Sequence, residues 1–229
     1  MGDQTSWHRR AAAVVVRHIY LKGIGTMIFI AVFFGAYFYL LKAPAFPTTV
    51  MPITFLDQLI GFQPLALPLY VSLWVYVSLP PALLATRREL YFYGTALAVP
   101  CLIGLTVFYF WPTAVPAANI DWARYPEMSF LKDMDASGNA CPSLHVTTAV
   151  FSGVWLHHLL RRLEAPRSIL VFNLLWGAGI VYSTVATRQH VVVDVLAGIV
   201  LGALAACTAL RFHVDTGEVE KIRHSCEWP

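Results

Sequence analysis

The chain has 229 residues, of which 58% are hydrophobic and only 13% are charged. An ordinary soluble domain carries roughly 25% charged residues, so this composition excludes a soluble enzyme, and its apolar character equally excludes a disordered or collagen-like chain. The formal net charge is +3, and the 16 Lys and Arg residues lie in short clusters beside apolar runs. We therefore expect membrane lipids, and not nucleic acid, as the partner.

Six predominantly apolar stretches are long enough to cross a hydrocarbon core of roughly 30 Å as helices. In chain order they cover residues 24–41, 65–85, 92–112, 143–160, 168–187 and 191–212. Between the first two, residues 53–62 place apolar side chains on one helical face and Asp57 near the rim. This pattern indicates either a short helix at the outer membrane interface or a plain loop.

The basic residues predict the orientation, because short cytoplasmic loops carry an excess of Lys and Arg. With the N-terminus inside, twelve of them fall on the inner side, and the outer side keeps only Lys42, Arg124, Lys132 and Arg188. Residues 43–45 have the small-x-small form of a signal cleavage site, but the preceding segment is longer than a usual signal peptide, so we expect the first span to remain. The prediction is one all-α membrane domain over residues 1–229. It comprises an N-terminal cytoplasmic segment 1–23, a six-span catalytic core 24–212 and a cytoplasmic tail 213–229.

Polar residues gather at the starts of two predicted spans. The fourth span opens with Pro142-Ser143-Leu144-His145, and the sixth opens with Arg188-Gln189-His190, followed by Asp194. Both spans run inward, so the two clusters lie at the same depth near the extracytoplasmic face and can meet. Ionisable residues at membrane depth are costly and mark a functional site by default.

These residue types suit phosphoryl transfer through a phosphohistidine. His190 and Asp194 are four residues apart, so on a helix they share one face and the carboxylate can fix the imidazole tautomer. The other ring nitrogen is then free to act as a nucleophile. Ser143 can cap the fourth span and leave backbone N–H groups near His145 directed at an anion, while Arg188 adds a fixed charge for phosphate.

Two other classes of function remain. Two histidines and a carboxylate can bind a metal, but no third outer histidine accompanies them and the charge of Arg188 opposes a divalent ion, so we expect no metal and no cofactor. The protein could also be a non-enzymatic membrane bundle, in which Ser143 only caps a helix and Arg188 only anchors a helix end.

At these residues the chain resembles the type 2 phosphatidic acid phosphatase superfamily, whose members are six-span membrane enzymes or soluble relatives with the same helical core. The family's motif Pro-Ser-Gly-His is similar to residues 142–145, and Ser-Arg-x5-His-x3-Asp is similar to residues 183–194. The resemblance covers residues 50–205. It implies that His190 is the nucleophile, Asp194 its orienting partner, His145 the acid for the leaving group and Ser143 a phosphate contact.

The chain departs from the family pattern at the cations. Leu144 stands where the family has Gly, and Thr184 stands where the third motif has Arg. The first motif, Lys-x6-Arg-Pro, aligned on Pro116, finds Phe108 and Val115 where Lys and Arg are expected. This pattern is similar to the branch of inositol phosphorylceramide and sphingomyelin synthases, in which the two His and the Asp persist without the basic motif.

Other basic residues can replace the missing cations. Arg188 is the first candidate for phosphate binding, and Lys132 or Arg124 in the outer loop are weaker ones. With these residues the sequence predicts a metal-independent lipid phosphate phosphatase that acts on the extracytoplasmic side, in the periplasm or outside, of a bacterial inner (plasma) membrane. Transfer of a phospho-headgroup to an alcohol is the alternative, because both reactions share one phosphoenzyme.

Overall fold

The computed structural model describes residues 5–118, 120–128 and 138–213. Most of these residues are helical. The helices are α1 (Thr5–Val16), α2 (Ile19–Lys42), α3 (Phe55–Ile60), α4 (Leu67–Val71), α5 (Leu73–Ala82), α6 (Arg87–Phe110), α8 (Leu144–Arg162), α9 (Arg167–Ala186) and α10 (Val192–Phe212). Two short strands, β1 (Thr49–Val50) and β2 (Thr113–Ala114), and two 3-10 turns, η1 (Pro64–Ala66) and η2 (Trp122–Arg124), complete the described part.

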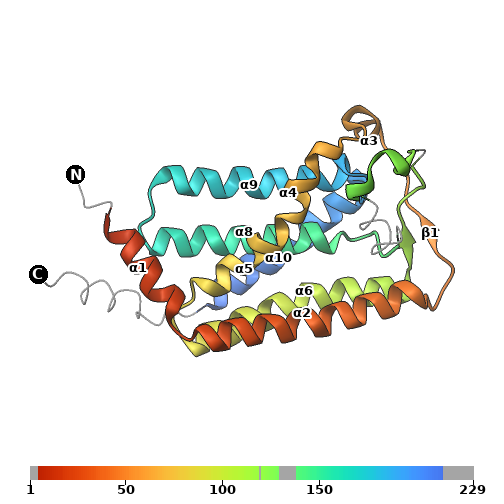
Figure 1. The fold of residues 1–229 in the computed structure, drawn as a ribbon. Helices are drawn as coiled ribbons and strands as arrows, with labels where there is room; N and C mark the ends of the chain where they lie inside the picture. The colour runs from red at the N-terminus through yellow and green to blue at the C-terminus, as the bar shows by residue number, and fades with distance from the viewer. Residues whose placement is uncertain (1–4, 119, 129–137, 214–229) are drawn as a thin grey trace, which may run out of the picture.

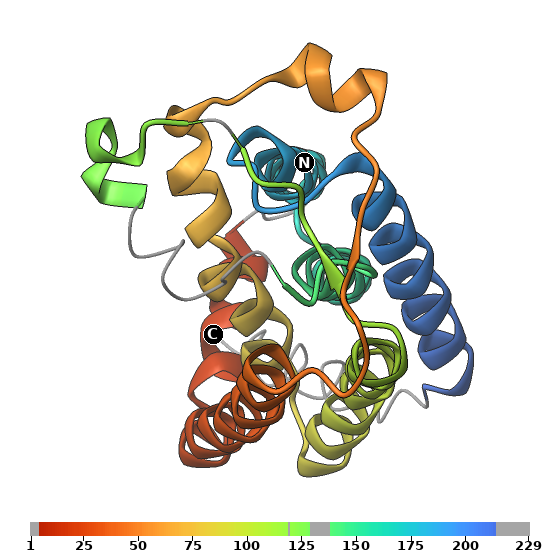
Figure 2. The same ribbon diagram turned by 90° about the vertical axis from the view of Figure 1, so that its right-hand side faces the viewer.

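The long helices run side by side, with α8 in the middle (Figures 1 and 2). Viewed along the bundle from the end that carries β1, α8 is enclosed by α5, α6, α9 and α10, and it contacts all four. Its side chains Val146, Phe151 and Trp155 are fully buried. Because neighbouring helices shield α8 from lipid, this helix can carry more polar residues than the helices around it.

Five segments are long and apolar enough to cross a membrane: Ile19–Lys42, Pro64–Ala82, Arg87–Phe110, Arg167–Ala186 and Val192–Phe212. They coincide with five of the six predicted spans and confirm an all-α membrane bundle. The predicted fourth span, residues 143–160, is the helix α8, which does not reach the same apolar content over the described residues. Its central place explains the difference.

Helical structure begins earlier in the chain than the first predicted span. Residues 5–16 form α1, and α2 already includes Lys22. The ammonium of Lys22 donates to the carbonyl oxygens of Val14 at 2.6 Å and Ala82 at 2.8 Å, while buried Arg10 pairs with Glu164 at 2.8 Å. The first predicted span, residues 24–41, lies within α2, and the helix extends back to Ile19 because it accommodates Lys22. Here the lysine satisfies carbonyls at the helix ends and stays inside.

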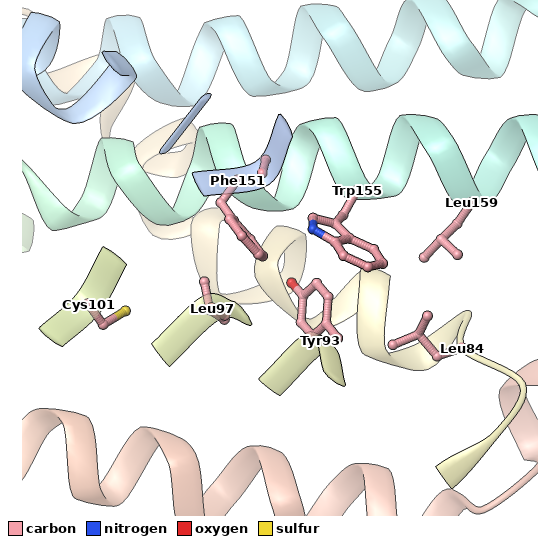
Figure 3. Packing of buried hydrophobic residues seen from close by; sticks show 8 residues of the cluster. Leu84, Tyr93, Leu97, Cys101, Phe151, Trp155 and Leu159 are labelled. Carbon is pink, nitrogen blue, oxygen red and sulfur yellow. The ribbon is translucent and has the colours of Figure 1, made fainter. Parts of the chain in front are cut away.

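Aromatic packing between α6 and α8 stabilises the half of the bundle that contains the start of α6 and the end of α8 (Figure 3). Tyr93 on α6 meets Trp155 on α8 edge to face, with ring centroids 5.2 Å apart and planes at 87°. Phe151, Leu97 and Leu159 belong to the same buried cluster. Truncating a buried aromatic side chain of this kind costs about 3–5 kcal/mol, so the cluster holds α8 firmly in register with α6.

Short elements cover the opposite end, where α8 and α10 begin. Strands β1 and β2 pair in parallel, with Thr49 opposite Thr113, and join the segment after α2 to the segment after α6. The backbone N–H of Cys141 donates to Thr113 Oγ1 at 2.8 Å, which ties the sheet to the start of α8. The helix expected near residues 53–62 is present as α3, but Asp57 is fully buried and does not lie at the rim.

Candidate functional site

The start of α8 is built around Ser143. Its side chain caps the helix by accepting the backbone N–H of Val146 at 3.2 Å, as the sequence predicted for an N-cap residue. Its own backbone N–H donates to the carbonyl oxygen of Asp194 at 3.1 Å. The two polar clusters are therefore in direct contact although about fifty residues of sequence separate them.

Two glycines on α10 allow this contact. A Cβ atom on Gly198 would lie 2.6 Å from the carbonyl oxygen of Ser143, and one on Gly202 would lie 2.5 Å from that of Thr147. Both distances are shorter than a Cβ atom tolerates. The hydroxyl of Thr147 also donates to the carbonyl oxygen of Gly198 at 3.3 Å. Gly198 and Gly202 are four residues apart and share one helical face, so α10 approaches α8 closely along its first half.

The loop that carries His190 is held through its backbone. The amides of Gln189 and His190 both donate to the carbonyl oxygen of Thr184 at 3.1 Å. The next amide, Val191, donates to Asp194 Oδ2 at 3.1 Å. Arg188 adopts the left-handed conformation, with φ of 60°, which turns the chain between α9 and α10. The imidazole of His190 therefore projects from a rigid turn.

His190 and Asp194 lie together, but not on one helix. His190 precedes the first residue of α10, and Asp194 lies in the first turn of that helix. His190 Nδ1 is 3.7 Å from Asp194 Oδ2, which is an ion-pair distance and longer than a hydrogen bond. The carboxylate faces Nδ1, so Nε2 is the ring nitrogen left for chemistry.

Three buried polar atoms at this site have no hydrogen-bond partner among the described residues. They are His145 Nε2, His190 Nδ1 and Asp194 Oδ1. The ring of His145 stacks on Tyr70 of α4, with centroids 4.1 Å apart and planes at 21°. Buried polar groups are nearly always satisfied in native proteins, so unpaired groups at two helix starts that are in contact indicate a ligand site.

A cavity of about 360 Å³ opens beside His190. Its polar lining comes from Arg188, His190 and Gln58. The remaining walls are apolar and come from the segments on either side of α3, from the segment after β2 and from the residue before α10: Ile53, Phe62, Val115, Pro116, Ala117, Ala118, Ile120 and Val191. A small charged group bonded to an apolar one would suit this arrangement.

Positions where the family motifs have other residues are buried and apolar here. Leu144 turns its side chain toward α6, where its methyl groups occupy the space over Gly104. Phe108 and Val115 are also buried. Thr184 is fully buried and donates its hydroxyl to the carbonyl oxygen of Val181 at 2.8 Å, so this side chain does not face the cavity. Phe108, Val115 and Thr184 therefore supply no positive charge where the family motifs have Lys or Arg.

The three basic residues predicted to bind phosphate lie in different parts of the chain. Arg188 lines the cavity with His190. Arg124 is highly exposed, pairs with Asp121 at 3.1 Å and is absent from the cavity lining. Lys132 lies outside the described residues. Arg188 is thus the basic side chain that the described part of the chain brings to the site.

Two residues that contact the starts of α8 and α10, Asp57 and Tyr70, were not predicted as site residues from the sequence. Asp57 accepts the backbone N–H of Val192 at 2.8 Å and so joins α3 to the start of α10. Its available signal was the spacing Thr54-x-x-Asp57, which forms a capping box at the start of α3. No local signal pointed to the stacking of Tyr70 on His145, because it depends on how α4 and α8 pack.

The described residues contain no group of three or more His, Cys, Asp or Glu side chains placed to hold a metal ion. The His145, His190 and Asp194 set is instead accompanied by a helix N-terminus and an arginine. Such a set supplies a nucleophile, an orienting carboxylate, a proton donor and charge stabilisation for a phosphate.

Comparison with known families agrees with this chemistry. A model described as PAP2 superfamily matches residues 25–218, which include both polar clusters and all the helices from α6 to α10. No curated protein and no solved structure matches the chain. Members of the matched family are phosphoric ester hydrolases or transferases, and a protein with this match is an enzyme of that kind. The family match extends over most of the chain, and the protein belongs to the PAP2 superfamily.

Proposed function

We propose that the protein is a metal-independent lipid phosphate phosphatase that acts through a phosphohistidine on His190. The observation that carries the proposal is the contact between the starts of α8 and α10, which holds His145, His190 and Asp194, each with an unpaired buried polar atom, at one end of the bundle. Of these three residues, His190 lines the cavity together with Arg188. The type 2 phosphatidic acid phosphatase resemblance and the family match support the same chemistry.

In the first half of the reaction, Nε2 of His190 attacks phosphorus, and the bond from phosphorus to the lipid oxygen breaks. His145 enters protonated and gives its proton to that oxygen, so the lipid leaves as an alcohol. Asp194 stabilises the positive charge that develops on the ring of His190. Arg188 and the first amides of α8 neutralise the phosphate oxygens, and Ser143 is proposed as a further phosphate contact.

In the second half, neutral His145 removes a proton from water, and the water oxygen attacks the phosphohistidine. The bond from phosphorus to Nε2 breaks, and inorganic phosphate leaves. His190 is regenerated, and His145 again carries the proton that the next turnover needs. The cycle requires no metal ion and no cofactor.

The alternative is transfer of a phospho-headgroup to an alcohol, as in the inositol phosphorylceramide and sphingomyelin synthase branch. An acceptor such as inositol carries several hydroxyl groups, and each one buried without a partner costs about 1–3 kcal/mol. The cavity offers one neutral polar side chain, Gln58, beside Arg188 and His190. This lining favours water and an apolar leaving group over a polyol acceptor.

We also propose that α8 crosses the membrane as the fourth of six spans and that the site faces the extracytoplasmic side, in the periplasm of a bacterial inner membrane. Basic residues at the ends of α1, α6, α8 and α9 gather at the end of the bundle opposite the cavity (Figure 1). The positive-inside rule places that end in the cytoplasm.

The test uses the purified full chain in detergent with three substrates: phosphatidic acid, a polyprenyl diphosphate, and phosphatidylinositol with and without ceramide. We expect phosphate release that persists in EDTA and is blocked by vanadate, together with an acid-labile phosphoenzyme that His190→Ala lacks. Headgroup transfer to ceramide in place of phosphate release would select the transferase. The same activity in His190→Ala as in the wild type would exclude the phosphohistidine.

A further inference from the structure

Asp57 is a fully buried carboxylate on α3, 135 residues away in sequence from the helix that it contacts. Its Oδ2 accepts the backbone N–H of Thr54 at 2.7 Å and the Thr54 hydroxyl at 2.6 Å. Its Oδ1 accepts the backbone N–H of Val192, the first residue of α10, at 2.8 Å. One carboxylate therefore joins the start of α3 to the start of α10.

The bond to Val192 completes the support of the loop that carries His190. Four consecutive amides, those of residues 189–192, donate hydrogen bonds. The first two reach Thr184 and the third reaches Asp194, and both acceptors belong to α9 or α10, which flank the loop. Asp57 alone among these acceptors comes from a distant part of the chain.

The charge of Asp57 is also well placed. The first amides of a helix carry a partial positive charge, and hydrogen bonds from N–H groups to a carboxylate are roughly twice as strong as neutral ones. Asp57 and Asp194 together occupy the amides of Val191 and Val192. These two amides are then committed to protein carboxylates, so the substrate phosphate is left to α8 and Arg188.

We infer that Asp57 is a positioning residue for the phosphoryl transfer: through the amide of Val192 it fixes the turn that aims His190 at phosphorus. The inference rests on the proposed function of His190. Nearby Ile53 and Gln58 line the cavity, so the same segment that holds the loop also forms one wall of the site. Misplacing a reacting group by about 1 Å costs on the order of a hundredfold in rate.

A purely structural role, as the cap of α3, makes different predictions and can be separated by variants. Asp57→Ala removes both links, and Asp57→Asn keeps one acceptor oxygen while losing the charge. Thr54→Val breaks the side-chain half of the α3 cap but leaves the bond to Val192. Leu59→Ala changes an exposed residue of α3 that is not part of the cavity lining and serves as the matched control.

Two measurements on the full-length wild type and variants decide the inference. The first is hydrogen exchange by mass spectrometry over residues 188–194, which reports the loop without any substrate. The second is steady-state kinetics and phosphoenzyme yield with the fastest substrate of the lipid panel. Each variant is measured at the same number of degrees below its own melting temperature.

We expect Asp57→Ala to raise exchange at the amides of residues 191 and 192 at least tenfold. It should also lower kcat by about 10- to 100-fold with KM within about threefold. Asp57→Asn should fall between Asp57→Ala and the wild type. Thr54→Val and Leu59→Ala should keep kcat within about threefold of the wild type, because the link to α10 remains.

Wild-type exchange over residues 188–194 in Asp57→Ala would overturn the inference, and so would a loss in Thr54→Val equal to that in Asp57→Ala. If Asp57→Ala does not fold, the same comparison is made with Asp57→Asn. A wild type that forms no phosphohistidine would overturn the proposed function instead, while the exchange result would still decide whether Asp57 holds the loop.

Discussion

Asp194 has two contacts at the start of α10. Its Oδ2 accepts the amide of Val191 at 3.1 Å and lies 3.7 Å from Nδ1 of His190. The first contact holds the backbone of the loop, and in the proposed reaction the second stabilises the positive charge that develops on the ring of His190. A carboxylate in this position affects the reaction through both geometry and electrostatics.

Replacing Asp194 separates these two effects. Asp194→Asn keeps an oxygen for the amide of Val191 but removes the negative charge that stabilises the ring of His190. We expect kcat to fall by several orders of magnitude, by analogy with other carboxylates that orient a histidine, with the melting temperature within a few degrees of the wild type. Phosphate release under single-turnover conditions measures the loss. Normal turnover in Asp194→Asn would show that His190 needs no carboxylate.

Arg188 supplies the fixed positive charge in the proposed reaction, since α8 amides carry only partial charges. Arg188→Ala should cost about 3 kcal/mol of transition-state stabilisation, on the order of a hundredfold in kcat/KM. The kcat/KM of Arg188→Lys should fall between those of Arg188→Ala and the wild type, because lysine keeps the charge but lacks the planar guanidinium. Kinetics with phosphatidic acid measure both. Arg124→Ala is the comparison, because its side chain is exposed and paired with Asp121. A loss in Arg124→Ala and none in Arg188→Ala would reassign the phosphate contact.

At the scale of elements, the site depends on how closely α10 approaches α8. Gly198 faces the carbonyl oxygen of Ser143. Any larger residue at position 198 would push α10 and α8 apart. Leu144 and Gly104 form a second matched pair, between α8 and α6, in which the large side chain fills the space left by the small one. The starts of α8 and α10 therefore meet because glycine residues leave room for the atoms of the neighbouring helix.

The glycine contact gives a test of this geometry. Gly198→Ala places a Cβ atom 2.6 Å from the carbonyl oxygen of Ser143 and must push α10 away. We expect a loss of about 1–3 kcal/mol of stability and at least a tenfold loss of kcat, because His190 and Asp194 move with α10. Gly25→Ala on α2 is the control, since a Cβ atom there meets nothing within 4 Å. Thermal melts and turnover compare them, and equal behaviour of the two variants would contradict the close contact.

At the scale of the whole molecule, the segments that line the cavity and the helix ends that carry basic residues lie at opposite ends of the bundle (Figure 1). This separation makes the orientation testable with cysteine labelling. Cys141 is a poor reporter although it lies on the cavity side: burial, and then the charge of Asp194, raise the pKa of its thiol to about 11. Only roughly one thiol in a thousand is then the reactive thiolate at pH 8, and the fraction rises about tenfold per pH unit.

Exposed positions report the orientation better. Thr48 lies between α2 and β1, on the cavity side, and Ser168 lies in the first turn of α9 at the basic end; both are exposed. In intact cells an impermeant maleimide should label Thr48→Cys readily, the wild-type Cys141 slowly, and Ser168→Cys only after permeabilisation. Labelling of Ser168→Cys in intact cells would reverse the orientation and place the site in the cytoplasm.

The sequence by itself determined the membrane class, five of the spans and the two polar clusters. Apolar runs of about 20 residues have one stable solution in a bilayer, and polar residues at their ends stand out against them. The resemblance carried by residues 142–145 and 183–194 supplied the family, which the match over residues 25–218 confirms. The order of helices also placed His145 and His190 at the same end, because both helices start there.

Only the tertiary structure decided which residues complete the site. Asp57 reaches Val192 and Tyr70 reaches His145 through contacts between distant segments, and no local pattern encodes such distances. Lys22 lies inside α2, where a hydropathy rule excludes it, because carbonyl groups of other segments accept hydrogen bonds from its ammonium group. Helix α8 crosses the centre with few lipid contacts, so its composition follows from its neighbours and not from the bilayer. Local periodicity reports the solvent that a helix faces, whereas packing decides which helices face each other.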